Sequence, residues 1–250
     1  QDDIVHTELT VVQALTLTAE LRLAVSRSAV DSLVSGIIIK LGLKEHADKP
    51  VRILSGGQRK RVNIATELLV RPAVLFLDEP TSVLTPQEAD EVLGHVREFA
   101  RSGQCTVLII THKFREVMAY ADNVTVLRRG KAVHHCEVRA TDPHLLAQAM
   151  VGEAAVDTPP RESAAPAAGT SVAGAEASVA LDVRGLQAPG DRGPLALHGI
   201  DLQVRSGEVL GVAGVSGNGQ RELVEALVGQ RPRLAGEVRV MGEPYHARRE

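Results

Sequence analysis

Two short, largely apolar runs constrain the fold more than any other feature of the sequence. They occupy residues 74–77 and 106–110, and a helical pattern with outward polar residues lies between them at residues 86–100. A strand that is buried on both faces needs no polar positions, so it appears as a continuous apolar run. Strand, helix and strand in this order are typical of a parallel sheet. The sequence therefore predicts an α/β fold.

Helical spacing of apolar residues predicts a small helical region within residues 5–45. A further helix is expected at residues 58–70, where Pro72 ends it. After the second apolar run, the pattern predicts helices at residues 114–121 and 143–151 and a hairpin formed by residues 124–127 and 131–133.

Residues 153–179 differ in composition from the rest of the chain. They are rich in Ala, Pro, Ser, Thr and Glu and contain few large apolar side chains, which is typical of a flexible linker. Apolar patterning then resumes and predicts strands at residues 197–204, 209–212 and 236–240 and a helix at residues 220–228. The chain thus divides into residues 1–152, a linker at 153–179, and residues 180–250.

Charge and composition exclude several classes of protein. The formal net charge of −3 gives no electrostatic reason to expect a nucleic-acid partner. Two cysteines are too few for a disulfide framework and suit a reducing cytoplasm. No apolar run approaches the length of a spanning helix, so a membrane role is expected to require a separate partner chain. The start has no signal-peptide pattern and no Met, which is consistent with a fragment or a processed product.

A glycine-dense stretch follows one predicted strand and opens a predicted helix. It reads Gly214-Val215-Ser216-Gly217-Asn218-Gly219-Gln220-Arg221. Glycines allow the backbone N–H groups to point at a phosphate, and the helix N-terminus assists them. The frame matches the phosphate-binding pattern G-x-x-x-x-G-K-[ST], but Gln220 replaces the Lys and Arg221 replaces the hydroxyl residue. A plain strand-to-helix turn is the competing interpretation.

Two other motifs are compatible with phosphate chemistry. Asp78 and Glu79 follow an apolar run, where one carboxylate can hold Mg²⁺ through water and the other can orient or deprotonate an attacking water. An acidic turn at a strand end is the alternative. Before the helix at 58–70 stands Leu54-Ser55-Gly56-Gly57-Gln58, which predicts a second anion-binding helix N-terminus or a simple helix cap.

In their order along the chain, these motifs resemble those of the ATP-binding cassette (ABC) ATPases. The stretch at residues 54–58 resembles the ABC signature motif, and residues 74–79 resemble the Walker B strand with its catalytic Glu. His112 resembles the switch His, and Gln1 resembles the Q-loop Gln. The resemblance implies a P-loop NTPase sheet with a small helical subdomain.

Two stretches are similar to the tandem ATPases of simple-sugar and nucleoside importers. They are residues 78–88 and the degenerate loop at residues 214–220. Residues 1–69, by contrast, look more like ABC exporters of the white type. The chain is therefore a mosaic, and the resemblance leaves both the solute and the direction of transport open.

The resemblance implies ATP and Mg²⁺ as cofactors and assigns roles to individual residues. Glu79 and His112 are expected to be catalytic, and Asp78 and Gln1 to serve the metal. Residues expected to contact nucleotide are Gln1, Leu54, Ser55, Gly56, Gly57, Gln58, Gly214, Val215, Ser216, Gly217, Asn218, Gly219, Gln220 and Arg221. Without a Lys at position 220, the γ-phosphate charge is poorly neutralised, so weak binding and little turnover are expected from the chain alone.

Two arrangements of the halves are compatible with the sequence. Residues 1–152 resemble the later part of one ABC ATPase domain, and residues 180–250 resemble the early part of a second domain with a degenerate Walker A loop. Either both belong to a longer tandem protein, or they complement each other as one circularly permuted domain. The second arrangement predicts that residues 214–219 lie in the same sheet as Asp78.

The leading functional hypothesis is an ATP-binding and ATP-hydrolysing subunit of an ABC transporter. It would power import of a sugar or nucleoside at the cytoplasmic face of the plasma membrane. Its expected partners are transmembrane permease subunits and a second ABC ATPase domain, in the same or another chain. One alternative is a non-catalytic nucleotide-binding regulatory or assembly module. Another is a soluble ABC protein acting on ribosomes or DNA, for which a basic or highly charged linker would be expected.

Overall fold

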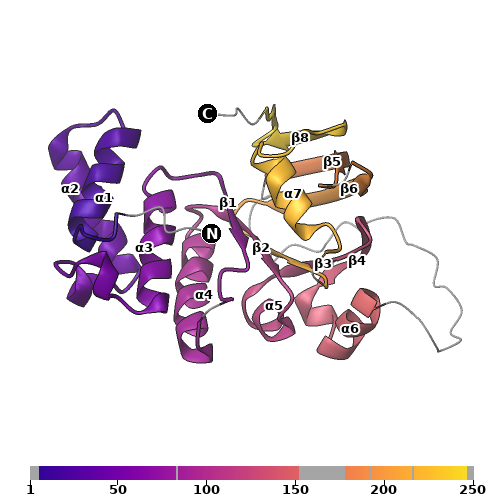
Figure 1. Cartoon of the computed structure of the whole chain (residues 1–250), viewed down its shortest axis with the longest axis horizontal. Coiled ribbons are helices and arrows are strands. Elements are labelled where there is room, and N and C mark those ends of the chain that lie inside the picture. Colours follow the sequence, from indigo (N-terminus) through magenta and orange to yellow (C-terminus); the bar gives the residue numbers. More distant parts are fainter. Residues whose placement is uncertain (1–5, 83, 152–177, 192, 216, 247–250) are drawn as a thin grey trace, which may run out of the picture.

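The computed structural model describes residues 6–82, 84–151, 178–191, 193–215 and 217–246. Helices gather at one end of the described chain, and two sheets lie at the other (Figure 1). The arrangement is an α/β fold, as the apolar runs predict.

The helical end contains α1 (Val11–Arg22), α2 (Arg27–Lys40) and α3 (Gly56–Leu68), which confirms the expected helical region. Thr10 begins α1 through a capping box with Gln13, because each side chain satisfies the other residue's free N–H. Two short 3₁₀ turns connect α2 to α3, at Lys44–His46 and Val51–Ile53. The apolar faces of these elements enclose fully buried leucines, which include Leu15, Leu41, Leu43 and Leu69.

A five-stranded sheet combines strands from both parts of the chain. Its members are β1 (Val74–Asp78), β2 (Thr106–Thr111), β3 (Asn123–Arg128), β4 (Lys131–Glu137) and β7 (Val209–Ala213). The order is β1-β2-β7-β3-β4, and all neighbours are parallel except β3 and β4. The strand β7 thus lies between β2 and β3, although residues 112–208 separate it from β2 in the chain. Gly214 and Val215 therefore leave the same edge of the sheet as Asp78, with β2 between the two strands.

The strand β1 departs from the expectation of burial on both faces. Its burial alternates, with Leu75 and Leu77 buried and Phe76 half-buried, whereas every residue of β2 is buried. The reason is position: β1 is the outermost strand on its side of the five, so its second face receives less cover.

Three helices cover one face of the five-stranded sheet, and α7 (Gln220–Leu227) and the second sheet cover the other. On one face, α4 (Pro86–Arg101), α5 (Phe114–Tyr120) and α6 (Pro143–Val151) share a core with Val107 and Ile109 of β2. On the other face, α7 packs with Leu108 and Ile110. A 3₁₀ turn at Val138–Ala140 precedes α6. The alternate residues of β2 therefore join both cores.

The second sheet is antiparallel and comes entirely from the later part of the chain. It contains β5 (Val179–Pro189), β6 (Leu195–Arg205), β8 (Ala235–Val240) and β9 (Glu243–Pro244), in the order β6-β5-β8-β9. Its buried residues belong to the same core as α7 and the second face of the first sheet. The expected return of order near residue 179 is confirmed by β5, while residues 153–177 of the expected linker lie outside the described residues.

Gly130 joins the two sheets. It lies in the β3–β4 turn, where its carbonyl accepts from His198 N and its N–H donates to the Asn218 carbonyl, at 2.8 and 3.0 Å. A Cβ at this position would lie only 1.8 Å from the Ala196 carbonyl oxygen, so a side chain cannot be accommodated. The hairpin of the earlier part thereby contacts both β6 and the glycine loop of the later part.

Candidate functional site

The carboxyl ends of β1 and β2 meet at one edge of the sheet. Asp78 is in register with Ile110, and Glu79 N donates to the Ile110 carbonyl at 2.9 Å. Glu79 has a φ of 42°, in the left-handed region that residues with a Cβ rarely adopt. Conformations of this kind cost about 1–3 kcal/mol and persist only where their surroundings fix them. This backbone turn lets the Glu79 side chain reach the residue that follows β2.

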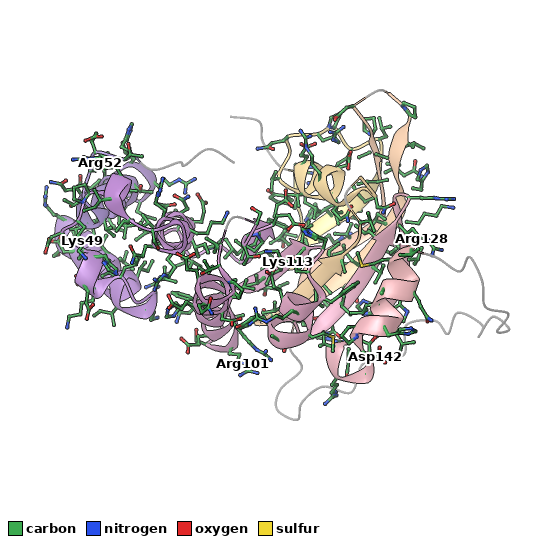
Figure 2. The ribbon with its side chains drawn as sticks, turned by 60° about the horizontal axis from the view of Figure 1, so that its bottom comes forward. Lys49, Arg52, Arg101, Lys113, Arg128 and Asp142 are labelled. Carbon is green, nitrogen blue, oxygen red and sulfur yellow. The ribbon has the colours of Figure 1, made fainter. Side chains whose placement is uncertain are left out.

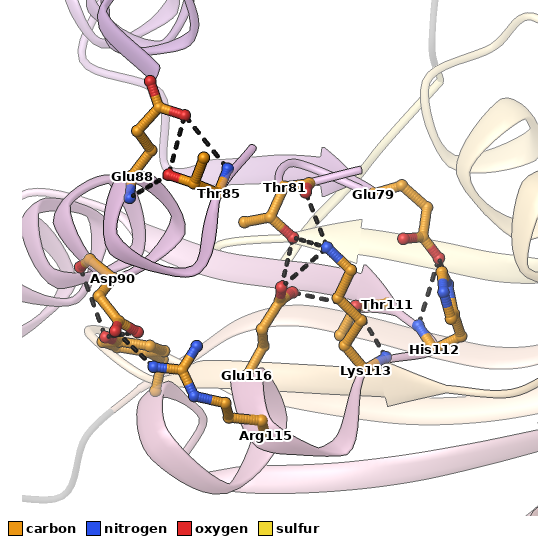
Figure 3. Close-up of polar contacts among 11 residues, drawn as sticks. Glu79, Thr81, Thr85, Glu88, Asp90, Thr111, His112, Lys113, Arg115 and Glu116 are labelled. Carbon is orange, nitrogen blue, oxygen red and sulfur yellow. Dashed lines mark hydrogen bonds and ion pairs between the residues drawn. The ribbon is translucent and has the colours of Figure 1, made fainter. Parts of the chain in front are cut away.

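That residue is His112, and it contacts Glu79 twice (Figure 3). The His112 Nδ1 atom lies 2.7 Å from Glu79 Oε1, and the His112 backbone N–H donates to the same oxygen at 3.2 Å. The other oxygen, Oε2, is buried without a hydrogen-bond partner among the described residues. A buried, unpartnered carboxylate oxygen beside a half-exposed imidazole is suited to accept a hydrogen bond from a water or substrate. The structure thus brings the two expected catalytic residues together.

Charges of both signs act on the Asp78 carboxyl group. Burial raises its pKa first, and the neighbouring charge of Glu79 raises it further, while Lys60 and Arg221 act in the opposite direction. Lys60 comes from α3 and Arg221 from α7, so charged groups from both parts of the chain act on this carboxylate.

The two adjacent carboxylates fit a hard cation that arrives with phosphate oxygens. Mg²⁺ is commonly held through one or two carboxylates together with substrate phosphates and water. Asp78 and Glu79 provide that donor set, and a cation would relieve the like charge that raises the Asp78 pKa. Within the described ranges, no group of three or more His, Cys, Asp or Glu side chains could hold an ion without a substrate. Gln1, the other expected metal residue, lies outside those ranges.

The glycine loop has the backbone that its sequence predicts. Gly217 and Gly219 have φ values of 87° and 104°, which only glycine adopts readily. Gly219 is the N-cap of α7 and provides no side-chain oxygen to the first turn of the helix. Ser216 lies outside the described residues. Gly217 and Gly219 therefore shape a turn at a helix N-terminus, which is a backbone arrangement suited to a phosphate.

The Gln220 side chain folds back onto the glycine loop and forms hydrogen bonds with its backbone. Its Oε1 accepts from Asn218 N at 3.2 Å, and its Nε2 donates to the Val215 carbonyl at 3.1 Å. The side chain is 8% exposed, and a Cβ added to Gly214 would lie 2.3 Å from its Nε2. A neutral carboxamide thus uses an N–H group that a bound phosphate would need. Arg221 pairs with Glu225 at 2.7 Å and adds no hydroxyl to the loop.

The turn before α3 is capped and also contacts a carboxylate. Ser55 and Gln58 form a capping box. Gly57 N donates to Glu88 Oε1 at 3.2 Å, and a Cβ on Gly57 would lie 2.9 Å from Glu88. Hydrogen bonds from Thr85, Ser55 and Gly57 lower the Glu88 pKa. An anion therefore already occupies this helix N-terminus, and none of the turn's described hydrogen bonds reaches residues 214–219.

Motif reasoning missed Glu88 and a buried cluster around Glu116. Thr85 and Glu88 form the capping box that begins α4, so the Thr-x-x-Glu pattern could have identified the cap. No local pattern reveals that Glu88 also reaches α3, or that Glu116 contacts the segments after β1 and β2. Those contacts depend on how distant elements pack.

Sequence comparisons point to one family. Residues 1–82 match the family model described as ABC transporter. The chain is 35% identical over 201 residues to the nucleoside import ATP-binding protein NupA of Lactococcus lactis, covering 80% of this chain and 38% of the relative. It is 43% identical over 189 residues to the glucose import ATP-binding protein TsgD13 of Haloferax volcanii, covering 76% and 32%. For the ribose import ATP-binding protein RbsA 2 of Burkholderia ambifaria, identity is 34% over 218 residues, covering 87% and 40%.

A solved structure is also similar to this chain. The structure of cbiO1 from Clostridium perfringens, described as part of the ABC transporter complex cbiONQ, aligns with a TM-score of 0.52 and 29% identity. The alignment covers 56% of this chain and 55% of that one.

Together, the sheet, the motifs at its edge and these matches show that the chain is similar to the ATP-binding proteins of ABC transporters and has the P-loop NTPase fold. Within that class, the sequence is similar to the sugar and nucleoside importers. The chain spans less than half the length of the relatives that it matches. None of the helices in the described ranges is long and apolar enough to cross a membrane.

Proposed function

We propose that the chain supplies ATP-binding and ATP-hydrolysing machinery to an ABC transporter that imports a sugar or a nucleoside. The observation that carries the proposal is the Glu79–His112 pair beside Asp78, on the same sheet edge as the glycine loop. The names of the relatives, which specify nucleoside, glucose and ribose import, support the class of solute.

Each side chain at this edge has a distinct task in the proposal. The unpartnered oxygen of Glu79 orients the attacking water, and His112 steadies the γ-phosphate from the neighbouring strand end. The N–H groups of residues 214–219 hold the phosphates. Asp78, together with Gln1, would hold Mg²⁺, and the ion would supply positive charge that neutralises the phosphates.

The proposal also assigns partners, which follow from the family resemblance. The turn at residues 54–58 serves the nucleotide of a second ABC ATPase domain, in the same or another chain. Transmembrane permease subunits receive the conformational change at the cytoplasmic face of the plasma membrane. The interleaving of β7 with β2 and β3 supports the view that residues 1–152 and 180–250 complement each other as one permuted domain.

Binding and turnover by the chain alone are expected to be weak. Gln220 brings no positive charge to the loop and competes for the Asn218 N–H. Transition-state stabilisation in phosphoryl transfer depends on such charge. The same observation favours a second candidate, a non-catalytic nucleotide-binding module that regulates or assembles a larger ATPase.

The test is to measure ATP binding and phosphate release by the purified chain, with Glu79→Gln as the matched isosteric variant. We expect weak ATP binding, and slow phosphate release that Glu79→Gln lowers by about 10²–10⁴-fold, as for loss of a general base. ATP binding with phosphate release identical in both proteins would support the non-catalytic module. If the chain does not bind ATP with or without Mg²⁺, the proposal is wrong.

A further inference from the structure

A buried carboxylate lies behind the Glu79–His112 pair. Glu116 on α5 is 5% exposed, and its two oxygens receive three donors. Thr81 Oγ1 donates at 2.5 Å, Thr111 Oγ1 at 3.1 Å, and Lys113 Nζ lies 3.3 Å away. Figure 3 shows the four side chains converging between the segments that follow β1 and β2.

The donors flank the two expected catalytic residues in sequence. Thr81 follows Glu79 by two positions, and Thr111 and Lys113 stand on either side of His112. Lys113 Nζ also donates to the Thr81 carbonyl at 2.7 Å, so it crosses between the two segments. Glu116 therefore contacts neither Glu79 nor His112, yet it binds the neighbours of both.

The hydrogen-bond pattern requires an acceptor at Glu116. The Thr111 hydroxyl accepts from Lys113 N at 3.1 Å and therefore offers its proton to Glu116. The Thr81 hydroxyl accepts from Lys113 Nζ at 3.1 Å and likewise points its proton at Glu116. An ionised carboxylate accepts through both oxygens, whereas an amide of the same shape turns one of them into a donor. A Gln at this position leaves at least one buried donor facing another donor.

The cluster also explains how Glu79 keeps an unfavourable backbone. A non-glycine residue with a φ of 42° needs fixed surroundings. The segment is held on one side by the Glu79 N bond to β2, and on the other by the contacts of Thr81 with Lys113 and Glu116. Loss of the Thr81 contacts would free the backbone to relax and the Glu79 carboxylate to move away from His112.

We propose that Glu116 is a positioning residue that holds Glu79 and His112 in contact by fixing the segments on which they lie. The proposal rests on the proposed function for its catalytic meaning, but its geometry can be tested without nucleotide. Its direct consequence is the tautomer of His112, because the ring nitrogen that donates is set by the hydrogen bond it makes. With Glu79 Oε1 at 2.7 Å, the neutral imidazole should carry its proton on Nδ1.

The experiment is ¹⁵N NMR of histidine-labelled protein at pH 9, where imidazoles are generally neutral. His112 is assigned by the loss of its signal in His112→Gln. The variants are Glu116→Gln and, as the matched control, Asp90→Asn. Asp90 of α4 accepts from Arg115, the neighbour of Glu116, and from Tyr120 at 2.8 Å, so the control weakens the same α4–α5 packing without touching either threonine.

We expect the wild-type and Asp90→Asn proteins to hold His112 as the Nδ1–H tautomer, and Glu116→Gln to shift it toward a mixture with Nε2–H. An unchanged tautomer in Glu116→Gln overturns the proposal, as does an equal shift in both variants, which would indicate general loosening of α5. If Glu116→Gln does not fold, Thr81→Val is used instead, because it removes the hydroxyl contacts with Glu116 and Lys113. The same two outcomes then overturn the proposal. The tautomer result stands whether or not the chain binds ATP, so failure here and failure of the proposed function are distinguishable.

Discussion

Two regions lie at the same edge of one sheet: the ends of β1 and β2, and the loop after β7. They differ in the side chains that they place at this edge. At the first, charged side chains are held by buried contacts, and Glu79 meets His112 at 2.7 Å. At the second, the glycine backbone is in place, but the side chain at the critical position is a neutral carboxamide that bonds to the loop itself.

The difference separates two requirements of a phosphate site. Glycines with positive φ allow a frame of N–H groups, and Gly217 and Gly219 have such φ values beside the neutral Gln220. Stabilising a transferring phosphoryl group additionally needs fixed positive charge, which the frame lacks. The first region thus holds a carboxylate and an imidazole in contact, whereas the glycine loop carries a neutral side chain at position 220.

The largest expected effect concerns the core that both regions share. Leu210 of β7 is fully buried between β2 and β3, in the core that also contains Leu108 of β2. Leu210→Ala should lower the free energy of unfolding by about 2–5 kcal/mol, because it leaves a cavity in a packed core. Chemical denaturation followed by circular dichroism measures the change, with the exposed Leu234→Ala as a control expected to stay within about 0.5 kcal/mol. If only part of the transition moves, the two regions unfold separately and the shared core is contradicted.

A smaller effect is expected from restoring charge to the loop. The double variant Gln220→Lys with Arg221→Thr should tighten ATP binding by about 10–100-fold, since a hydrogen bond to a charged group contributes about 1.5–3 kcal/mol. Titration calorimetry with Mg²⁺ and ATP measures the change. Glu222→Lys places a positive charge on the next position of α7 but outside the loop, so it controls for simple attraction. Equal gains in both proteins would show that the loop is not the phosphate site.

The smallest expected effect is on stability at the Asp78 carboxylate. Burial and Glu79 raise its pKa above 3.8, so the folded chain holds this proton more tightly than the unfolded chain. Stability from this group is therefore present at low pH and is lost as pH rises through the window above 3.8. Asp78→Asn should stabilise the protein by about 0.5–2 kcal/mol at neutral pH and by less in acid. Urea titrations of both proteins at acidic and neutral pH test this, and the opposite pH trend would contradict the stated cause.

The sequence predicts the individual helices and strands of this fold better than it predicts which of them lie side by side. Apolar runs identify β1 and β2, and the glycine pattern identifies the turn before α7, because these signals are local. A single sheet shared by β7 and β1 is the outcome of one of the two arrangements that the sequence allowed, and the place of β7 between β2 and β3 was not predicted. Strand pairing depends on contacts between distant residues. The back-folded Gln220 side chain could not be predicted for the same reason.

The candidate site divides in the same way. Glu79 and His112 could be named from the motif resemblance, but their direct contact depends on the left-handed backbone of Glu79, which no propensity favours. Glu116 carried no signal, because an acidic residue in a helix after a strand is common and its burial follows only from the packing of α5. Gln1 and Ser216 remain predictions, as they lie outside the described residues.

The most direct test of the account is to cut the chain between its two regions. A protease site placed within residues 153–177 allows the purified protein to be cleaved and then examined by size-exclusion chromatography and thermal unfolding. Because β7 lies between β2 and β3, the account predicts that both fragments co-elute and unfold in one cooperative transition. Separate elution of two folded fragments, each with its own transition, would contradict a site built jointly from both parts of the chain.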